Sequence, residues 1–159
     1  MKKVFILMII FLSSAFADYS IYYNKIKLGT INNFNTLKDN YIKIRVTNPI
    51  IKIMLGKKEL VYFNTEYKQG TLYYNKKIYF KKDKHEVINV LKGVSSSNFK
   101  NKKIFFNSKS YLDITYDKNY QFKYYSKGKI KTKGDINIFN NEIISLNDTI
   151  NNILIIKNN

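Results

Sequence analysis

Short segments in which apolar and polar residues alternate recur along most of this chain of 159 residues. The clearest is Tyr41–Thr47, where aliphatic residues take every second position and Lys43 and Arg45 fall between them. One apolar face and one wet face are typical of an antiparallel sheet. Turn residues such as Asn24-Lys25 and Asn140-Asn141 separate these segments. We therefore expect a mainly β protein, a curved antiparallel sheet, half-barrel or barrel of about nine short strands with one or two short helices.

One segment that breaks the alternation follows Tyr41–Thr47. Asn48 can cap a helix, Pro49 suits a first helical turn, and Gly56 would end the helix. The residues between them are nearly all apolar, so a buried strand remains the alternative to a helix.

A second helix is expected over residues 84–92. Asp83 can accept a backbone hydrogen bond at the cap, Glu86 can reach back to it, and Gly93 is a natural stop. His85 would then lie in solvent at the start of this helix.

The rest of the chain, on either side of this helix, is expected to form strands joined by turns and loops. Residues 104–116 read as one strand, and residues 72–81 as a hairpin. Apolar residues on two later strands are expected to share the inner face. They are Tyr120, Phe122, Tyr124, Ile130, Ile136 and Ile138.

The first seventeen residues have the three-part pattern of a secretory signal. Lys2 and Lys3 precede the apolar run Val4–Leu12, and Ala15 and Ala17 provide a small-x-small cleavage site. The apolar run would span roughly 14 Å as a helix, short for a bilayer core of about 30 Å. We expect a cleaved signal over 1–17 and a single β-rich domain over 18–159. An uncleaved anchor, or a first apolar strand, is the alternative.

The chain has no cysteine. Lipidation at the cleavage site, disulfides, thiol catalysis and thiolate metal sites are therefore excluded. We expect a periplasmic, exported protein that is not a lipoprotein.

The formal net charge is +17, carried by lysines with a single arginine, Arg45. Such a charge can indicate an anionic partner. It can also reflect codons rich in A and T, which encode the abundant Lys, Asn, Ile, Tyr and Phe. Nucleic acid is not expected as the partner of an exported protein. The most specific basic feature is a row of lysines, which would project from one strand face about 6.6 Å apart, or protect an edge strand from aggregation. The row is Lys127, Lys129, Lys131 and Lys133.

The search for chemistry gives no catalytic residue, cofactor or metal site. His85 is the only histidine, and the position four residues later is Asn89, so the helical zinc-protease motif fails. Asp113 and Asp117 could face a sugar as a glycosidase pair, but no motif surrounds them. We therefore expect a non-enzymatic protein, with a carboxylate-dependent hydrolase as a minor alternative.

The opening motifs Tyr19-x-Ile21-x-Tyr23 and Ile26-x-Leu28-Gly29, followed by Asn40-Tyr41-x-Lys43, resemble an uncharacterised bacterial periplasmic family, domain of unknown function 3108. The likeness covers the N-terminal third. It implies an exported, β-rich envelope protein without known catalysis and supplies no functional residues.

These expectations converge on binding at the concave face of the sheet. If the protein's own helix fills this face, we expect the protein to bind an envelope protein partner. If the face is hollow, we expect it to hold an apolar ligand such as a lipid. A basic surface binder of anionic envelope polymers such as lipopolysaccharide is the alternative. The expected apolar face consists of Ile42, Ile44, Phe122, Tyr124, Ile136 and Ile138.

Overall fold

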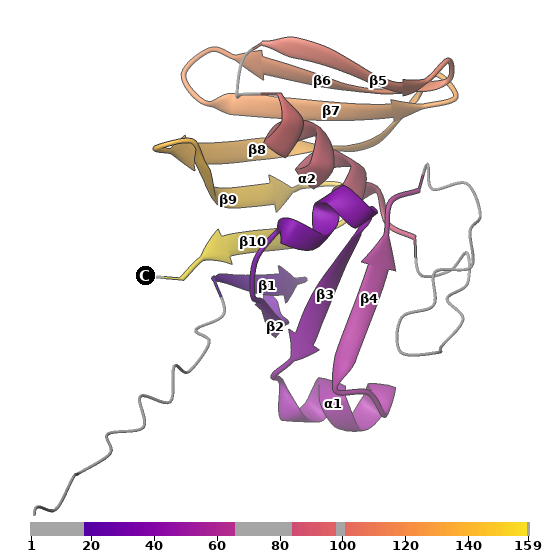
Figure 1. The fold of residues 1–159 in the computed structure, drawn as a ribbon. Helices are drawn as coiled ribbons and strands as arrows, with labels where there is room; N and C mark the ends of the chain where they lie inside the picture. The colour runs from indigo at the N-terminus through magenta and orange to yellow at the C-terminus, as the bar shows by residue number, and fades with distance from the viewer. Residues whose placement is uncertain (1–17, 66–83, 98–100, 159) are drawn as a thin grey trace, which may run out of the picture.

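The computed structural model describes residues 18–65, 84–97 and 101–158, which form one antiparallel sheet with helices on one side (Figure 1). The strands are β1 (Tyr19–Tyr23), β2 (Ile26–Ile31), β3 (Tyr41–Val46), β4 (Glu59–Phe63), β5 (Lys102–Asn107), β6 (Ser110–Tyr116), β7 (Tyr120–Ser126), β8 (Lys129–Phe139), β9 (Glu142–Asp148) and β10 (Ile153–Lys157). The helices are α1 (Pro49–Leu55), α2 (Glu86–Ser96) and the short 3-10 helix η1 (Asn35–Asp39).

The ten described strands follow the order β4-β3-β2-β1-β10-β9-β8-β7-β6-β5, so the sheet stays open and does not close into a barrel. Every strand pairs with at least one neighbour in the sequence. In addition, β1 pairs with β10, which joins the two ends of the chain near the middle of the sheet. The sheet is strongly twisted, and β3 and β4 run across the direction of β6–β8 (Figure 1). The mainly β architecture predicted from the alternation is confirmed.

Several tight turns match the sequence prediction. Asn24 and Lys25 both adopt positive φ, 48° and 66°, and Asn140 and Asn141 adopt 49° and 61°. Two consecutive residues at positive φ make the hairpin turn whose twist fits the flanking strands. Asparagine tolerates this region better than most residues.

The single strand predicted over 104–116 is wrong. The structure has the hairpin β5–β6 there, with its turn at Ser108 and Lys109. The Lys109 backbone N–H donates to Asn107 Oδ1 at 2.8 Å, a local bond that turns the chain without glycine or proline. The predicted signal at 1–17 and the hairpin at 72–81 lie outside the described residues.

Helix α1 forms as its caps predict. Asn48 Oδ1 accepts from the backbone N–H groups of Ile50 at 3.0 Å and Ile51 at 3.2 Å. Gly56 ends the helix in the left-handed region at φ 60°. The alternative of a buried strand is thereby excluded.

Helix α2 is confirmed, but both of its predicted end signals are wrong. His85, and not Asp83, is the N-cap, since its Nδ1 accepts from the Val87 N–H at 3.1 Å. Gly93 lies inside the helix, where a Cβ would come within 2.5 Å of Leu112 Cδ2. Gly93 therefore serves close packing of the helix on β6 and does not end the helix.

The main core lies between α2 and the strands β6, β7 and β8. Ile88 and Leu91 of α2 are wholly inaccessible to solvent, as is Leu112 of β6. We call the face of the sheet that carries α2 the inner face. The expectation that Phe122 and Tyr124 share this face is confirmed, because both are buried in the same core.

Candidate functional site

Helix α2 covers only part of the inner face. Over β1–β4 the sheet instead forms the floor of a pocket of 460 Å³, bounded by α1 and the start of α2. A pocket of this size falls in the range of about 300–1,000 Å³ that holds small molecules. We call it the apolar pocket.

The walls of the apolar pocket come from six separated segments of the chain. The buried floor contains Ile21, Ile42 and Ile44, and the exposed rim includes Tyr23 and Met54. The full lining is Ile21, Tyr22, Tyr23, Asn24, Ile26, Leu28, Ile42, Ile44, Ile51, Met54, Leu55, Leu60, Tyr62, His85, Val87 and Ile153. Almost every member is aliphatic or aromatic, so the pocket favours an apolar ligand.

Of the six residues expected to line one apolar face, five belong to one buried core cluster and Ile138 packs against it. Ile42 and Ile44 line the apolar pocket. The other four do not line that pocket: Phe122, Tyr124, Ile136 and Ile138. The inner face thus both holds the protein's own helix and leaves a hollow.

His85 is a pocket residue that sequence reasoning missed. It packs edge-on against Tyr62, with ring centroids 6.2 Å apart. Burial lowers the pKa of the His85 imidazole, while the neighbouring Glu86 and Asp148 act in the opposite direction. The neutral ring accepts a hydrogen bond at Nδ1, so its proton lies on Nε2. The expectation of a solvated histidine is wrong, since His85 is half-buried and lines the apolar pocket.

Helix α1 is unusual for a helix in a folded domain, because none of its residues is buried. Ile50, Ile53 and Met54 are exposed by 68%, 81% and 79%. Ile51 and Leu55 turn toward the apolar pocket and form part of its lining. The helix therefore borders the pocket on one side and presents apolar side chains outward on the other.

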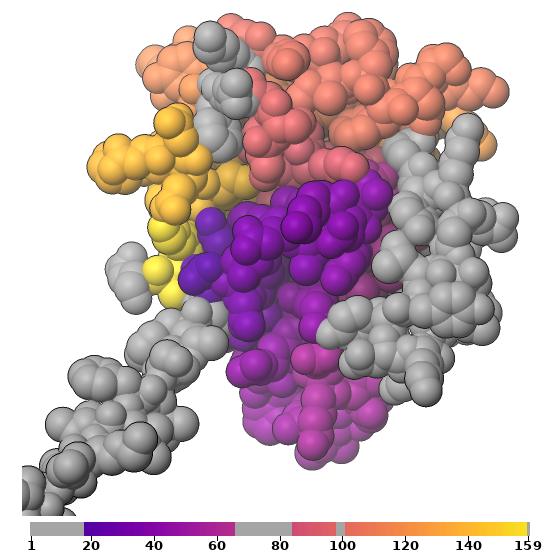
Figure 2. Space-filling model, viewed as in Figure 1, coloured from indigo at the N-terminus to yellow at the C-terminus, as the bar shows by residue number. Residues whose placement is uncertain are grey.

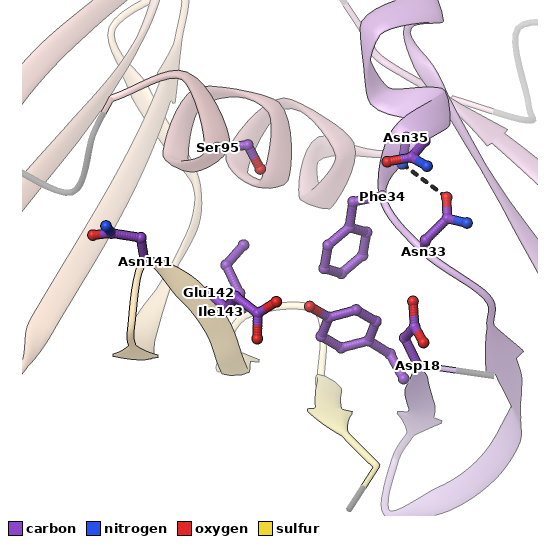
Figure 3. A pocket seen from close by; sticks show the side chains of 9 residues that line it. Asp18, Asn33, Phe34, Asn35, Ser95, Asn141, Glu142 and Ile143 are labelled. Atoms are coloured by element: carbon purple, nitrogen blue, oxygen red, sulfur yellow. Dashed lines mark hydrogen bonds between the residues drawn. The ribbon is translucent and has the colours of Figure 1, made fainter. Parts of the chain in front are cut away.

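A second pocket of 510 Å³ lies at the opposite end of β1 and is mostly polar. Figure 3 shows Glu142 and Ile143 of β9 facing Phe34 and Asp18, with Ser95 of α2 nearby. The described residues contain no cluster of three His, Asp or Glu side chains that could hold a metal.

This second, polar pocket is also lined by Tyr19, whose ring packs against that of Phe34 with the ring centroids 4.3 Å apart. Burial raises the pKa of the Tyr19 hydroxyl; Lys157 opposes the change, and Glu142 and Asp18 add to it. Glu142 is ion-paired with Lys157. Burial therefore favours the protonated form of the Tyr19 hydroxyl in this pocket.

The four lysines of the predicted row are all exposed, but they do not continue one regular strand face. Lys127 lies in the β7–β8 turn at φ 52°, before β8 begins. Within β8, Thr132 pairs with Tyr124 and Ile130 with Tyr125, which leaves Lys131 at a bulge. Lys129 and Lys133 lie on either side of that bulge.

The same bulge explains why Ile130 is not on the inner face. Ile130 pairs with Tyr125 and is 42% exposed, whereas Ile136 beyond the bulge is buried. A bulge inserts one residue into one strand and reverses the alternation there. The predicted inward position of Ile130 is therefore wrong.

Asp113 and Asp117 do not form a site in the described structure. Asp113 pairs in register with Lys103 on one side and Lys123 on the other. Asp117 lies exposed in the β6–β7 turn. Neither lines either of the pockets described above.

Comparisons with protein-family models, curated proteins and solved structures gave no match. The resemblance to domain of unknown function 3108 stays a prediction. Within residues 18–65, 84–97 and 101–158, no helix is long and apolar enough to cross a membrane.

Proposed function

We propose that this protein is a non-enzymatic binding protein of the bacterial envelope that holds an apolar, acyl-chain-like molecule in the apolar pocket. The observation that carries the proposal is a hollow of 460 Å³ lined almost wholly by aliphatic and aromatic side chains. Side chains of this kind gain free energy when a ligand replaces water against them, at about 25 cal/mol per Å² of apolar surface.

The few polar groups support a ligand with one polar end. His85 and Asn24 are the polar residues of the lining, and both belong to its edge segments, one at the start of α2 and one in the β1–β2 turn. A small number of polar groups in an apolar pocket fixes the orientation of the ligand. The His85 Nε2–H would donate to an oxygen of the head group.

The signal-like residues 1–17 support the compartment. An apolar molecule that crosses an aqueous periplasm needs its surface covered. A pocket on a water-exposed β-sheet provides that cover.

The test is binding of a neutral apolar fluorophore, phenylnaphthylamine, whose emission rises in apolar surroundings. Ile51→Trp would fill the pocket from α1, where Ile51 is only half-buried and the fold should tolerate the change. Ile156→Trp, on the opposite face of the sheet, is the matched control.

We expect saturable binding by the unchanged protein and by Ile156→Trp, and a loss of roughly tenfold or more in affinity for Ile51→Trp. Displacement of the fluorophore by a fatty acid would identify the ligand class. An unchanged protein that does not bind, or equal binding by both variants, would contradict the proposal.

A further inference from the structure

The apolar residues around the pocket mouth gather at one end of the sheet. Met54 and Leu55 of α1 line the same pocket as Tyr23 and Ile26, which flank the β1–β2 turn. The Asn24 N–H donates to the Asn152 carbonyl at 3.0 Å, which ties this turn to the β9–β10 turn. In Figure 2, α1 forms the protruding lower end of the described molecule.

This end is also basic. Lys52, Lys57 and Lys58 lie on α1 or directly after it, and residues 48–58 contain no acidic residue. Lys25 and Lys27 lie at the β1–β2 turn, where residues 19–31 also contain no acidic residue. An apolar centre with lysines around it matches a bilayer surface, since apolar side chains enter the head-group region and ammonium groups meet anionic lipids.

We propose that the α1 end docks on an anionic lipid bilayer, with Ile50, Ile53 and Met54 inserted among the head groups and the mouth of the apolar pocket at the membrane. The membrane would then be the place where the apolar ligand enters or leaves. This role in ligand exchange rests on the proposed function, whereas the docking itself does not.

A membrane suits this surface better than a protein groove. A helix that binds in a protein groove presents anchors over two turns or more, at i, i+3, i+4 and i+7. Helix α1 has seven residues, and its most exposed apolar side chains, Ile50, Ile53 and Met54, fall within about one turn. A shallow apolar tip with flexible lysines fits a fluid surface, because lysine stems can extend along it toward the phosphates.

The test is flotation of the protein, expressed from its full sequence, with vesicles of phosphatidylcholine alone or mixed with phosphatidylglycerol. The critical variant is Ile50→Ser/Ile53→Ser, since neither residue lines the pocket. Phe105→Ser/Phe139→Ser is the matched control, because those side chains are exposed by 67% and 66% elsewhere. All variants share residues 1–17, so a difference between them comes from the altered surface.

We expect the unchanged protein to bind the anionic vesicles. The affinity for these vesicles should fall roughly tenfold or more in Ile50→Ser/Ile53→Ser and should not fall in this way in the control. Lys57→Gln/Lys58→Gln should weaken binding and reduce its salt dependence, while Lys129→Gln/Lys131→Gln, with the same loss of charge, should not. Equal vesicle binding by the critical variant and its control would overturn the proposal. Self-association of the protein without vesicles, seen in sedimentation and lost in Ile50→Ser/Ile53→Ser, would also overturn it, because a second copy would then cover α1.

A titration with phenylnaphthylamine in the absence of vesicles separates this proposal from the pocket. Ile50→Ser/Ile53→Ser should bind the fluorophore as the unchanged protein does. Loss of vesicle binding with intact fluorophore binding supports docking. Unchanged vesicle binding contradicts docking, and loss of fluorophore binding by this variant contradicts the pocket, because neither residue lines it.

Discussion

Replacing Gly93 by alanine brings two effects of similar size into opposition. Alanine is the better helix former by about 1 kcal/mol. The new Cβ, however, would lie 2.5 Å from Leu112 Cδ2 and 3.4 Å from Phe106 Cζ, whereas carbon atoms prefer about 3.5–4.0 Å. Leu112 is wholly buried, so it has little room to move. Overpacking of a filled core costs about 1–3 kcal/mol, and we expect Gly93→Ala to destabilise the fold by about 1 kcal/mol.

A second substitution makes this expectation testable. Leu112→Ala alone should cost about 3 kcal/mol, within the range of about 2–5 for a buried leucine. In the double variant the new Cβ of residue 93 enters the space that Leu112 has left, so the clash disappears and the gain in helix propensity remains. We expect the double variant to lose about 2 kcal/mol, well short of the roughly 4 kcal/mol of two independent changes.

Urea denaturation followed by circular dichroism measures the four free energies of unfolding. Ser95→Ala, at an exposed position of the same helix, is the control and should change stability by less than about 0.5 kcal/mol. If the two substitutions add within about 0.5 kcal/mol, Gly93 and Leu112 are not in contact and the placement of α2 on β6 is refuted.

Other predictions follow from single positions. Gly134→Ala should abolish folding, because its Cβ would come within 1.7 Å of the Asn147 backbone oxygen. The Cβ of Gly128→Ala meets no atom within 4 Å, so this variant should lose only about 1 kcal/mol of stability, for its φ of 74°. Thermal unfolding distinguishes the two variants. Burial lowers the pKa of His85 below its ordinary 6.5, so the unfolded chain holds that proton more firmly. The resulting stability is complete above about pH 6.5 and is lost as the pH falls below that value. His85→Asn keeps a capping side chain, and its free energy of unfolding should lack this loss between about pH 7 and pH 5; parallel pH profiles for both proteins would contradict the assignment. Asn48→Ala should leave global stability nearly unchanged but speed amide hydrogen exchange in α1, because a seven-residue helix depends on its cap; unchanged exchange would contradict this.

Local signals in the sequence predicted much of the fold. The turns at Asn24-Lys25 and Asn140-Asn141, and the helix from Pro49 to Gly56, each depend on a few adjacent residues. Such features follow from backbone preferences that act within four or five positions. The strand alternation likewise follows from which residues face water, and it identified the mainly β class.

The errors arose where distant residues decide the structure. Gly93 has the local appearance of a helix stop, but β6 approaches so closely that only glycine fits within the helix. The bulge at Lys131 is set by pairing with β7 and reverses the face of Ile130. His85 replaces Asp83 at the helix cap, and its burial depends on Tyr62 of β4. None of these contacts can be read from neighbouring residues.

The candidate site was only partly predictable. Ile42 and Ile44 stood out because their strand alternates cleanly, but the other walls come from segments far apart in the sequence. One local signal did point to the site. The stretch from Ile50 to Leu55 is apolar at every position except Lys52, and so has no polar face to turn to solvent. A short helix of this composition either sinks into a core or remains exposed for a partner.

The existence of the pocket follows from the sizes of the elements. Ten strands at about 4.8 Å spacing make a sheet roughly 43 Å across. Helix α2 has eleven residues, about 16 Å in length and about 10 Å in diameter, so it can cover only a minority of the inner face. The β3 strand nevertheless places Ile42 and Ile44 on that face, as though it were covered throughout. The sheet therefore carries more inward apolar surface than α2 alone can bury. Ile42 and Ile44 are themselves only 1% exposed, and among the described lining residues the apolar side chains that stay exposed lie at the rim beside α1: Tyr23, Ile26, Met54 and Leu55. A hollow beside α1 is the consequence, and the bound apolar molecule that we propose would complete the packing of this half of the sheet.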